Sequence, residues 1–150
     1  MDNRYHSFTT LISRINRCIV KIKSKEMKIK GLKSTHVSCL YYLYINEKDS
    51  ITAKDLCLIC GEDKGAVSRA INFLLDNDYL KCDFDGKKAY KSPLLLTELG
   101  RRIGKYISEK IDQSIEQVSI GINEEDRNVL YGCLNLIANN LEKICEGVER

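Results

Sequence analysis

The sequence is poor in the features that mark membrane, secreted and multi-domain proteins. No apolar run among its 150 residues approaches the roughly 20 residues that a membrane-spanning helix needs. The first residues, Met1 to His6, lack the apolar core of a secretion signal, so we expect a cytoplasmic protein. The chain has one proline and no repeat, low-complexity tract or Pro/Gly-rich linker, which predicts a single domain over residues 1–150.

Histidine is also scarce, and its scarcity argues against two kinds of chemistry. The spacing of Cys57-x-x-Cys60 suits zinc, but a structural zinc site needs a second ligand pair, and the sequence has neither another Cys-x-x-Cys nor a histidine pair. Neither His6 nor His36 lies in a recognisable nucleophile setting, so a cysteine-based enzyme would lack its general base. We therefore expect no metal, no cofactor and no enzymatic activity.

Cysteine, in contrast, is plentiful. An odd count of seven in a chain without a secretion signal argues against a disulfide framework. Cys57, Cys133 and Cys145 fall at helical core spacing, and free cysteine is among the most buried residue types. They are predicted to be small apolar fillers.

Positive charge is concentrated in the first third of the chain, although the net charge is only +3. The basic residues of this region are Arg14, Arg17, Lys21, Lys23, Lys25, Lys28, Lys30 and Lys33. Segregated positive charge favours a nucleic-acid partner. The residues before Lys28 are more simply explained as the solvated face of an amphipathic helix.

Residues 52–77 have the pattern of a helix, a tight turn and a second helix. Thr52 and Asp55 form a variant of the capping box, Gly61 can end the first helix in the left-handed conformation, and Asp63 can cap the second. The apolar residues predicted to face the core are Ala53, Leu56 and Ile59 in the first helix and Val67, Ala70, Ile71 and Leu74 in the second.

The polar side of the second helix carries side chains that can read DNA. Arg69 can pair with both guanine acceptors in the major groove, Asn72 can do the same for adenine, and Ser68 reaches bases or phosphate. Lys64 faces the same way, and Gly65 removes bulk where the helix would approach a duplex.

A hairpin is predicted next, with strands at residues 81–84 and 89–96. Asp85-Gly86 is a strong two-residue turn signal, and Pro93 predicts a strand at a sheet edge. Lys87, Lys88 and Lys91 crowd the tip, where they suit phosphate or minor-groove contact. These lysines equally suit an exposed edge that is kept soluble.

The order of these elements resembles the MarR family of transcriptional regulators. The residues that carry the resemblance are Leu32-Lys33-Ser34-Thr35-His36, Leu56, Val67-Ser68-Arg69 and Leu96-Thr97-Glu98-Leu99-Gly100. It covers nearly the whole chain and implies a mainly α fold with a small β-hairpin wing. A winged helix-turn-helix core at about 32–98 would be flanked by helical dimerisation regions at 1–31 and 99–150. The family's Asp-x-Arg wing signature is here Asp85-Gly86-Lys87, and lysine acts as a point charge rather than a bidentate fork.

Three flanking helices carry narrow apolar stripes that favour a homodimer. The stripes comprise Phe8, Leu11 or Ile12, Ile15, Ile19 and Ile22; Leu99, Ile103, Ile107, Ile111, Ile115 and Val118; and Leu130, Leu134, Ile137, Leu141, Ile144 and Val148. Such seams bury best against their symmetry mates. The alternative is a monomeric bundle in which the stripes cover one another. Asn123 is predicted to cap the last helix.

The helix that begins near Ser34 raises the question of an effector. Ser34 is its predicted cap, Lys33 a candidate phosphate contact and His36 an ordinary polar helix residue. The family resemblance implies a crevice between the DNA-reading and dimerisation parts that binds small aromatic or phenolic ligands. One of the tyrosines at 41, 42 and 44 is expected to line it.

The sequence thus predicts a sequence-specific transcriptional regulator, a ligand-responsive repressor that binds a pseudo-palindromic double-stranded operator as a homodimer. The predicted DNA-binding residues are Lys54, Lys64, Gly65, Ser68, Arg69, Asn72, Lys87 and Lys88. Two alternatives stay open. One is a winged-helix protein-interaction module without DNA binding. The other is a thiol-based sensor using Cys18, because some relatives in the resembled family sense peroxides through a cysteine in the first helix.

Overall fold

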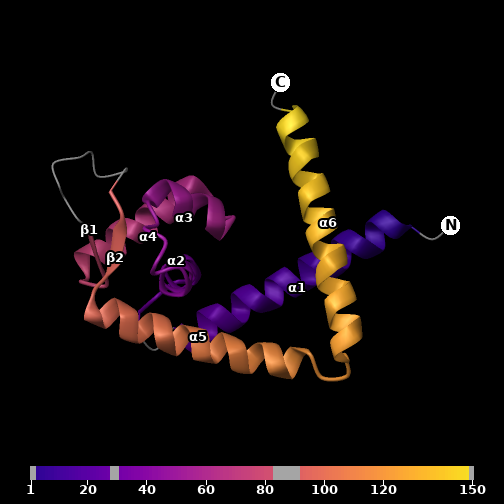
Figure 1. Ribbon diagram of the computed structural model, residues 1–150, viewed down its shortest axis with the longest axis horizontal. Helices are drawn as coiled ribbons and strands as arrows, with labels where there is room; N and C mark the ends of the chain where they lie inside the picture. The colour runs from indigo at the N-terminus through magenta and orange to yellow at the C-terminus, as the bar shows by residue number, and fades with distance from the viewer. Residues whose placement is uncertain (1–2, 28–30, 83–91, 149–150) are drawn as a thin grey trace. The chain divides into compact units, whose positions relative to one another are not determined.

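The computed structural model describes residues 3–27, 31–82 and 92–148, which form helices and two short strands (Figure 1). The helices are α1 (Arg4–Met27), α2 (Ser34–Ile45), α3 (Ala53–Cys60), α4 (Lys64–Asp76), α5 (Glu98–Val118) and α6 (Glu124–Val148); the strands are β1 (Leu80–Cys82) and β2 (Leu94–Leu96). The chain divides into two compact units, Met1–Ile111 and Asp112–Arg150. In the part of the chain described, no helix is both long and apolar enough to cross a membrane.

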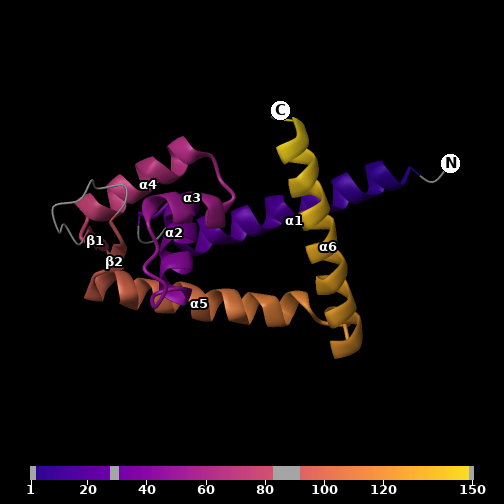
Figure 2. The same cartoon turned by 45° about the horizontal axis from the view of Figure 1, so that its top comes forward.

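The core of the first unit forms around α2, which packs against α3, α4 and β2 (Figures 1 and 2). Leu40 of α2, Leu56 of α3 and Leu74 of α4 are completely buried in it. Burying an aliphatic side chain of this size stabilises a fold by about 1.5–3 kcal/mol. The core also includes Ile107, so the first half of α5 is anchored to this unit.

The two strands form an antiparallel ribbon in which Leu80 lies opposite Leu96. In the described residues, β1 begins one position before the strand predicted at 81–84, and β2 covers the end of the strand predicted at 89–96. An isolated bridge between Thr52 and Pro93, with the Leu94 N–H donating to the Ile51 carbonyl at 2.8 Å, covers the outer edge of β2. Pro93 tolerates this edge position because its missing N–H removes no ladder bond within the ribbon. The predicted turn at Asp85-Gly86 and the lysines 87, 88 and 91 lie outside the described residues.

The Leu-Thr-Glu-x-Gly element joins β2 to α5 through close backbone contacts. The Thr97 Oγ1 accepts the Gly100 N–H at 3.0 Å, and the Thr97 N–H donates to the Tyr79 carbonyl at 3.1 Å. A Cβ at Gly100 would lie 2.0 Å from that carbonyl oxygen. The chain therefore needs threonine as a cap and glycine for close approach at this junction.

The start of α2 differs from the prediction. Lys33, not Ser34, is the N-cap residue, and its N–H donates to Nδ1 of His36 at 3.1 Å. His36, predicted to be an ordinary polar helix residue, is only 7% exposed and stacks on Phe73 of α4 with ring centroids 4.2 Å apart. The imidazole takes the place that a Glu or Gln side chain has in a capping box.

The cysteine prediction is also wrong in part. All seven cysteines are free thiols, and Cys133 and Cys145 of α6 are exposed rather than buried. Cys57 is partly buried, and the fully buried thiol is Cys39 of α2. Residues on a helix stripe become core only where another element covers the stripe.

The described side chains of α6 lie largely open when the unit of residues 112–150 is taken by itself. Leu130, Leu134, Leu141 and Ile144, all members of the predicted stripe, are at least 36% exposed. Asn123 caps the helix as predicted, because its Oδ1 accepts the Asp126 N–H at 2.8 Å. The α1 stripe of the first unit is similarly exposed at Leu11, Ile15, Ile19 and Ile22.

Candidate nucleic-acid interface

The first helix of the helix-turn-helix is fixed by its ends. Thr52 caps α3, with the Asp55 N–H donating to its Oγ1 at 3.3 Å and its own N–H donating to Asp55 Oδ2 at 3.0 Å. Hydrogen bonds from the Thr52 hydroxyl and N–H lower the pKa of the Asp55 carboxyl. Gly61 ends the helix with φ of 59°, the left-handed conformation that glycine adopts most readily. The predicted capping box and helix end are confirmed.

The second helix, α4, follows α3 after a turn of three residues, 61–63. Asp63 caps it by accepting the Ala66 N–H at 2.9 Å through Oδ2. The predicted inner face is confirmed, because Val67, Ala70, Ile71 and Leu74 are all buried. This packing fixes the rotation of α4 about its axis. In α3 the pattern holds for Leu56, but Ile59 is 38% exposed instead of buried.

The opposite face of α4 is open to solvent. Ser68, Arg69 and Asn72 are exposed together, and Lys64 is exposed one turn earlier. Gly65 is partly covered, since a Cβ there would lie 3.3 Å from Nη1 of Arg69 and 3.0 Å from Oδ2 of Asp63. The Arg69 guanidinium therefore folds back along the helix over Gly65. A larger residue at 65 would push it away.

The remaining predicted DNA-binding residues are lysines of α3 and of the predicted wing. Lys54, in the first turn of α3, is exposed. Lys87 and Lys88 lie outside the described residues, so the structure says nothing of the wing tip.

Sequence reasoning missed the contact that ties α4 to α2 through aromatic stacking. The rings of His36 and Phe73 are nearly parallel, with an interplanar angle of 5°. Burial and the neighbouring Lys33 ammonium lower the pKa of His36. The signal for the cap was present, because His36 stands three residues after Lys33, but its partner on α4 lies 37 positions away in the sequence.

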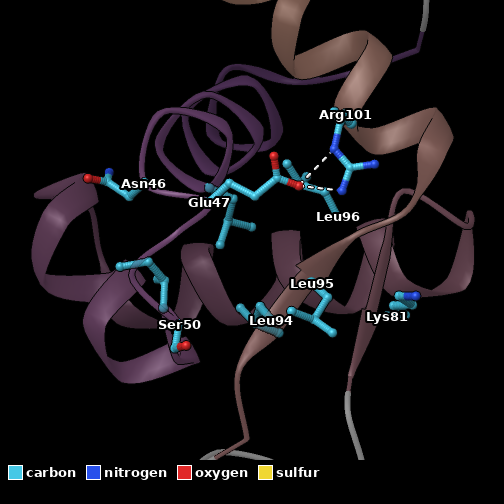
Figure 3. A pocket seen from close by; sticks show the side chains of 10 residues that line it. Asn46, Glu47, Ser50, Lys81, Leu94, Leu95, Leu96 and Arg101 are labelled. Carbon is cyan, nitrogen blue, oxygen red and sulfur yellow. Dashed lines mark hydrogen bonds and ion pairs between the residues drawn. The ribbon is translucent and has the colours of Figure 1, made fainter.

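A small pocket lies beside the end of α2, against the ribbon and the start of α5 (Figure 3). Its volume is about 170 Å³, and it is lined by Leu43, Asn46, Glu47, Ser50, Ile51, Lys81, Leu94, Leu95, Leu96 and Arg101. Arg101 donates to Glu47 Oε1 through Nε at 2.8 Å and also through Nη2. The tyrosines at 41, 42 and 44 do not line this pocket; they are partly buried and pack against the core.

The arrangement of α2, α3 and α4 followed by a two-stranded ribbon defines a winged helix-turn-helix protein. No protein-family model matches the chain, and no curated protein sequence matches it either. Solved structures do match it.

Three structures illustrate the likeness. A MarR transcriptional regulator from Methanosarcina mazei Go1 is 23% identical, with a TM-score of 0.78 over 96% of this chain and 94% of its own. A putative MarR-family regulator from Listeria monocytogenes complexed with 26mer DNA is 23% identical, with a TM-score of 0.80 over 94% and 90%. The S. aureus MepR-DNA complex is 15% identical, with a TM-score of 0.79 over 93% and 99%. The chain therefore has the fold of MarR-family transcriptional regulators, which confirms the resemblance seen in the sequence.

Proposed function

We propose that this protein is a cytoplasmic, DNA-binding transcriptional regulator that reads base edges with Ser68, Arg69 and Asn72 of α4. The observation that carries the proposal is that these side chains share an exposed face of a helix whose other face is buried. Arginine and asparagine are the side chains best suited to bidentate readout of guanine and adenine. The two DNA complexes with the same fold support it.

Phosphate contact is assigned to four lysines around this helix. Lys54 and Lys64 are exposed on α3 and α4, and Lys87 and Lys88 lie in the hairpin predicted from the sequence, outside the described residues. Such contacts position a protein on the duplex and supply affinity that falls with salt, without reading the sequence. In this proposal the lysines supply affinity for any duplex, and the three α4 side chains supply sequence specificity, so the two properties can be tested separately.

The functional unit in this proposal is a homodimer. Supporting it, Leu11 and Ile15 of α1 and Leu141 and Ile144 of α6 are about half exposed or more in the single chain. Twofold symmetry would present two copies of α4 to successive major grooves, roughly 34 Å apart. The expected operator is a pseudo-palindrome.

We further propose that a small aromatic effector releases this repressor from DNA. A cavity of about 150 Å³ can hold one benzene ring, so the 170 Å³ pocket beside α2 has room for a single ring. Lys81 and Arg101 would attract a carboxylate or phenolate on that ring. Because Arg101 is already paired with Glu47, an anionic ligand would have to compete for its guanidinium.

The test is to incubate the purified protein with fragmented genomic DNA of its source at physiological salt and to sequence the retained fragments. We expect one enriched inverted repeat with half-sites about one helical turn apart. A gel shift of that repeat should persist against excess unrelated duplex. If every duplex competes equally, sequence-specific reading is wrong; if no fragment is retained at all, the protein-interaction module without DNA binding becomes the better explanation.

A further inference from the structure

One buried side chain, His36, joins the start of α2 to the flank of α4. Its ring stacks on Phe73 of α4, with centroids 4.2 Å apart and planes 5° from parallel. Its Nδ1 accepts the Lys33 N–H at 3.1 Å, which closes the first turn of α2. Only 7% of the residue is exposed. The same imidazole therefore caps one helix and supports another.

Phe73 lies on α4 between the buried face of the helix and its exposed face. It is partly buried, whereas Leu74 is completely buried and Asn72 is exposed. Arg69 stands four positions before Phe73, and residues at this spacing are neighbours on a helix surface. A change in the packing of Phe73 would therefore displace α4 where it carries Arg69 and Asn72, two of the side chains proposed to read bases.

The site of the imidazole favours its neutral form. Burial, and then the ammonium of Lys33, lower the pKa of His36. Among the described residues, no ion pair joins the ring to a carboxylate that would stabilise an imidazolium. A proton on this ring would therefore carry an uncompensated charge into the site.

The other helices that pack near this ring also bring charged residues. On α4, those one turn to either side of Phe73 are Arg69 and Asp76, and both are exposed. On α1, which packs against α2, Lys23 donates from Nζ to Oγ of Ser38 at 3.0 Å. Asp76 is the one acid in this set, and its side chain is open to water, which screens its charge.

We propose that His36 is a positioning residue for α4 and that protonation of its ring releases α4, so that DNA binding weakens in acid. This inference rests on the proposed function of α4 as the helix that reads DNA. A proton on Nδ1 removes the acceptor of the Lys33 N–H, and an imidazolium in an almost closed site is costly unless it reaches water. When the ring moves toward water, it gives up its stack on Phe73.

The first measurement needs no DNA and uses the full, unmodified chain. NMR spectra between pH 7.5 and pH 5 follow the ring protons of His36, the side-chain amide of Asn72 and the Nε–H of Arg69. We expect the three signals to shift along one titration curve with a midpoint below 6.5, the ordinary pKa of histidine. The exposed His6 should follow a curve of its own.

Two results of this measurement would overturn the proposal. One is a His36 ring that stays neutral down to pH 5. The other is a His36 ring that titrates while the signals of Asn72 and Arg69 stay constant. Phe73→Leu removes the stacked ring, and in this variant Asn72 and Arg69 should no longer follow His36.

The second measurement titrates the operator repeat with protein at pH 7.5 and at pH 5.5, at one ionic strength. Glutamine can accept the Lys33 N–H at either pH, so His36→Gln should keep the cap without the titration. Between the two pH values the parent should lose up to about tenfold more affinity than His36→Gln, the factor that corresponds to one pKa unit between free and bound protein. His6→Gln is the matched control and should behave as the parent does.

Equal pH dependence of DNA binding in the parent and in His36→Gln would contradict the proposal. If His36→Gln folds poorly, the NMR titration of the unmodified chain decides. If the protein retains no DNA at either pH, the proposed function is wrong, and the NMR titration then shows separately whether His36 positions α4.

Discussion

At the scale of single residues, the position of Arg69 depends on its neighbours along α4. Its guanidinium passes close to Gly65, where a side chain would crowd it against the Asp63 cap. The glycine therefore leaves room for the arginine side chain, in addition to the role proposed for it in the approach of a duplex. This relation links two residues that sequence reasoning selected for separate reasons.

Replacing Arg69 with alanine should weaken operator binding by about 1–3 kcal/mol and relax the preference at one base pair, because a bidentate guanine contact is lost. The measurement is a gel-shift titration of the operator and of variants changed at each position. Arg102→Ala is the control, since Arg102 is an exposed arginine on α5. Equal operator affinity of Arg69→Ala and the parent would contradict the assignment.

Gly100→Ala should destabilise the fold by about 1–3 kcal/mol, the usual cost of overpacking a filled site. The new methyl group would clash with the Tyr79 carbonyl oxygen and would lie 3.2 Å from Cδ2 of Leu96. Urea unfolding measures the change. Gly132→Ala on α6 is the matched control, because nothing lies within 4 Å of its Cβ position. There alanine should stabilise the helix by up to about 1 kcal/mol. A Gly100→Ala variant as stable as the parent would show that the junction can relax.

At the scale of elements, the stacked rings of His36 and Phe73 connect the first turn of α2 to α4, the helix proposed to read DNA. Nδ1 of His36 can accept the Lys33 N–H only while the ring is neutral at that nitrogen. Protonation would remove the cap and place a charge against the core. The position of α4 is thus coupled to the protonation state of a residue outside it.

The stability of the protein should therefore fall as the pH falls below about 6.5, the ordinary pKa of histidine. Because the pKa of His36 is lowered in the folded state, the unfolded chain binds its proton first, so its contribution is complete above 6.5 and is lost toward the folded pKa. Urea unfolding between pH 7.5 and pH 5 measures this. The dependence of the unfolding free energy on pH should flatten in His36→Gln. It should persist in His6→Gln, the control, which replaces an exposed histidine of α1. An unchanged slope in His36→Gln would assign the pH dependence to other groups.

The boundaries of α3 and α4 could be predicted because the residues that set them are local. Thr52, Gly61 and Asp63 act on backbone groups within three or four positions. The start of α2 could not be placed as well, because the ring of His36 competes with Ser34 and is held by Phe73 from another helix. Local hydrogen bonds thus determine where α3 and α4 begin and where α3 ends. At α2, the tertiary contact of His36 with Phe73 favours Lys33 over Ser34 as the N-cap.

At the scale of the whole molecule, the apolar stripes on α1 and α6 stand out because their side chains remain exposed to solvent in the single chain. Leu134 and Leu141 lie on the predicted α6 stripe and are 36% and 49% exposed. Exposed apolar side chains in a continuous row mark an association surface. The proposed homodimer would cover them.

If the proposed homodimer forms through this stripe, Leu134→Glu should convert it to a monomer, because a carboxylate in the interface would be buried without a partner. Light scattering during size-exclusion chromatography measures the mass. The matched control is Asn139→Glu, which places the same charge on the opposite side of α6 and should leave the dimer intact. A Leu134→Glu variant with the parent's mass would place the interface elsewhere.

The sequence by itself determined the helix-turn-helix, its caps and the face of α4 that stays open, since each follows from residues within one or two turns of one another. Only the tertiary structure decided which cysteines are buried and that His36 is a core residue stacked on Phe73. These outcomes depend on which helix packs on which, and residues 37 positions apart become neighbours only when the core of α2, α3 and α4 forms.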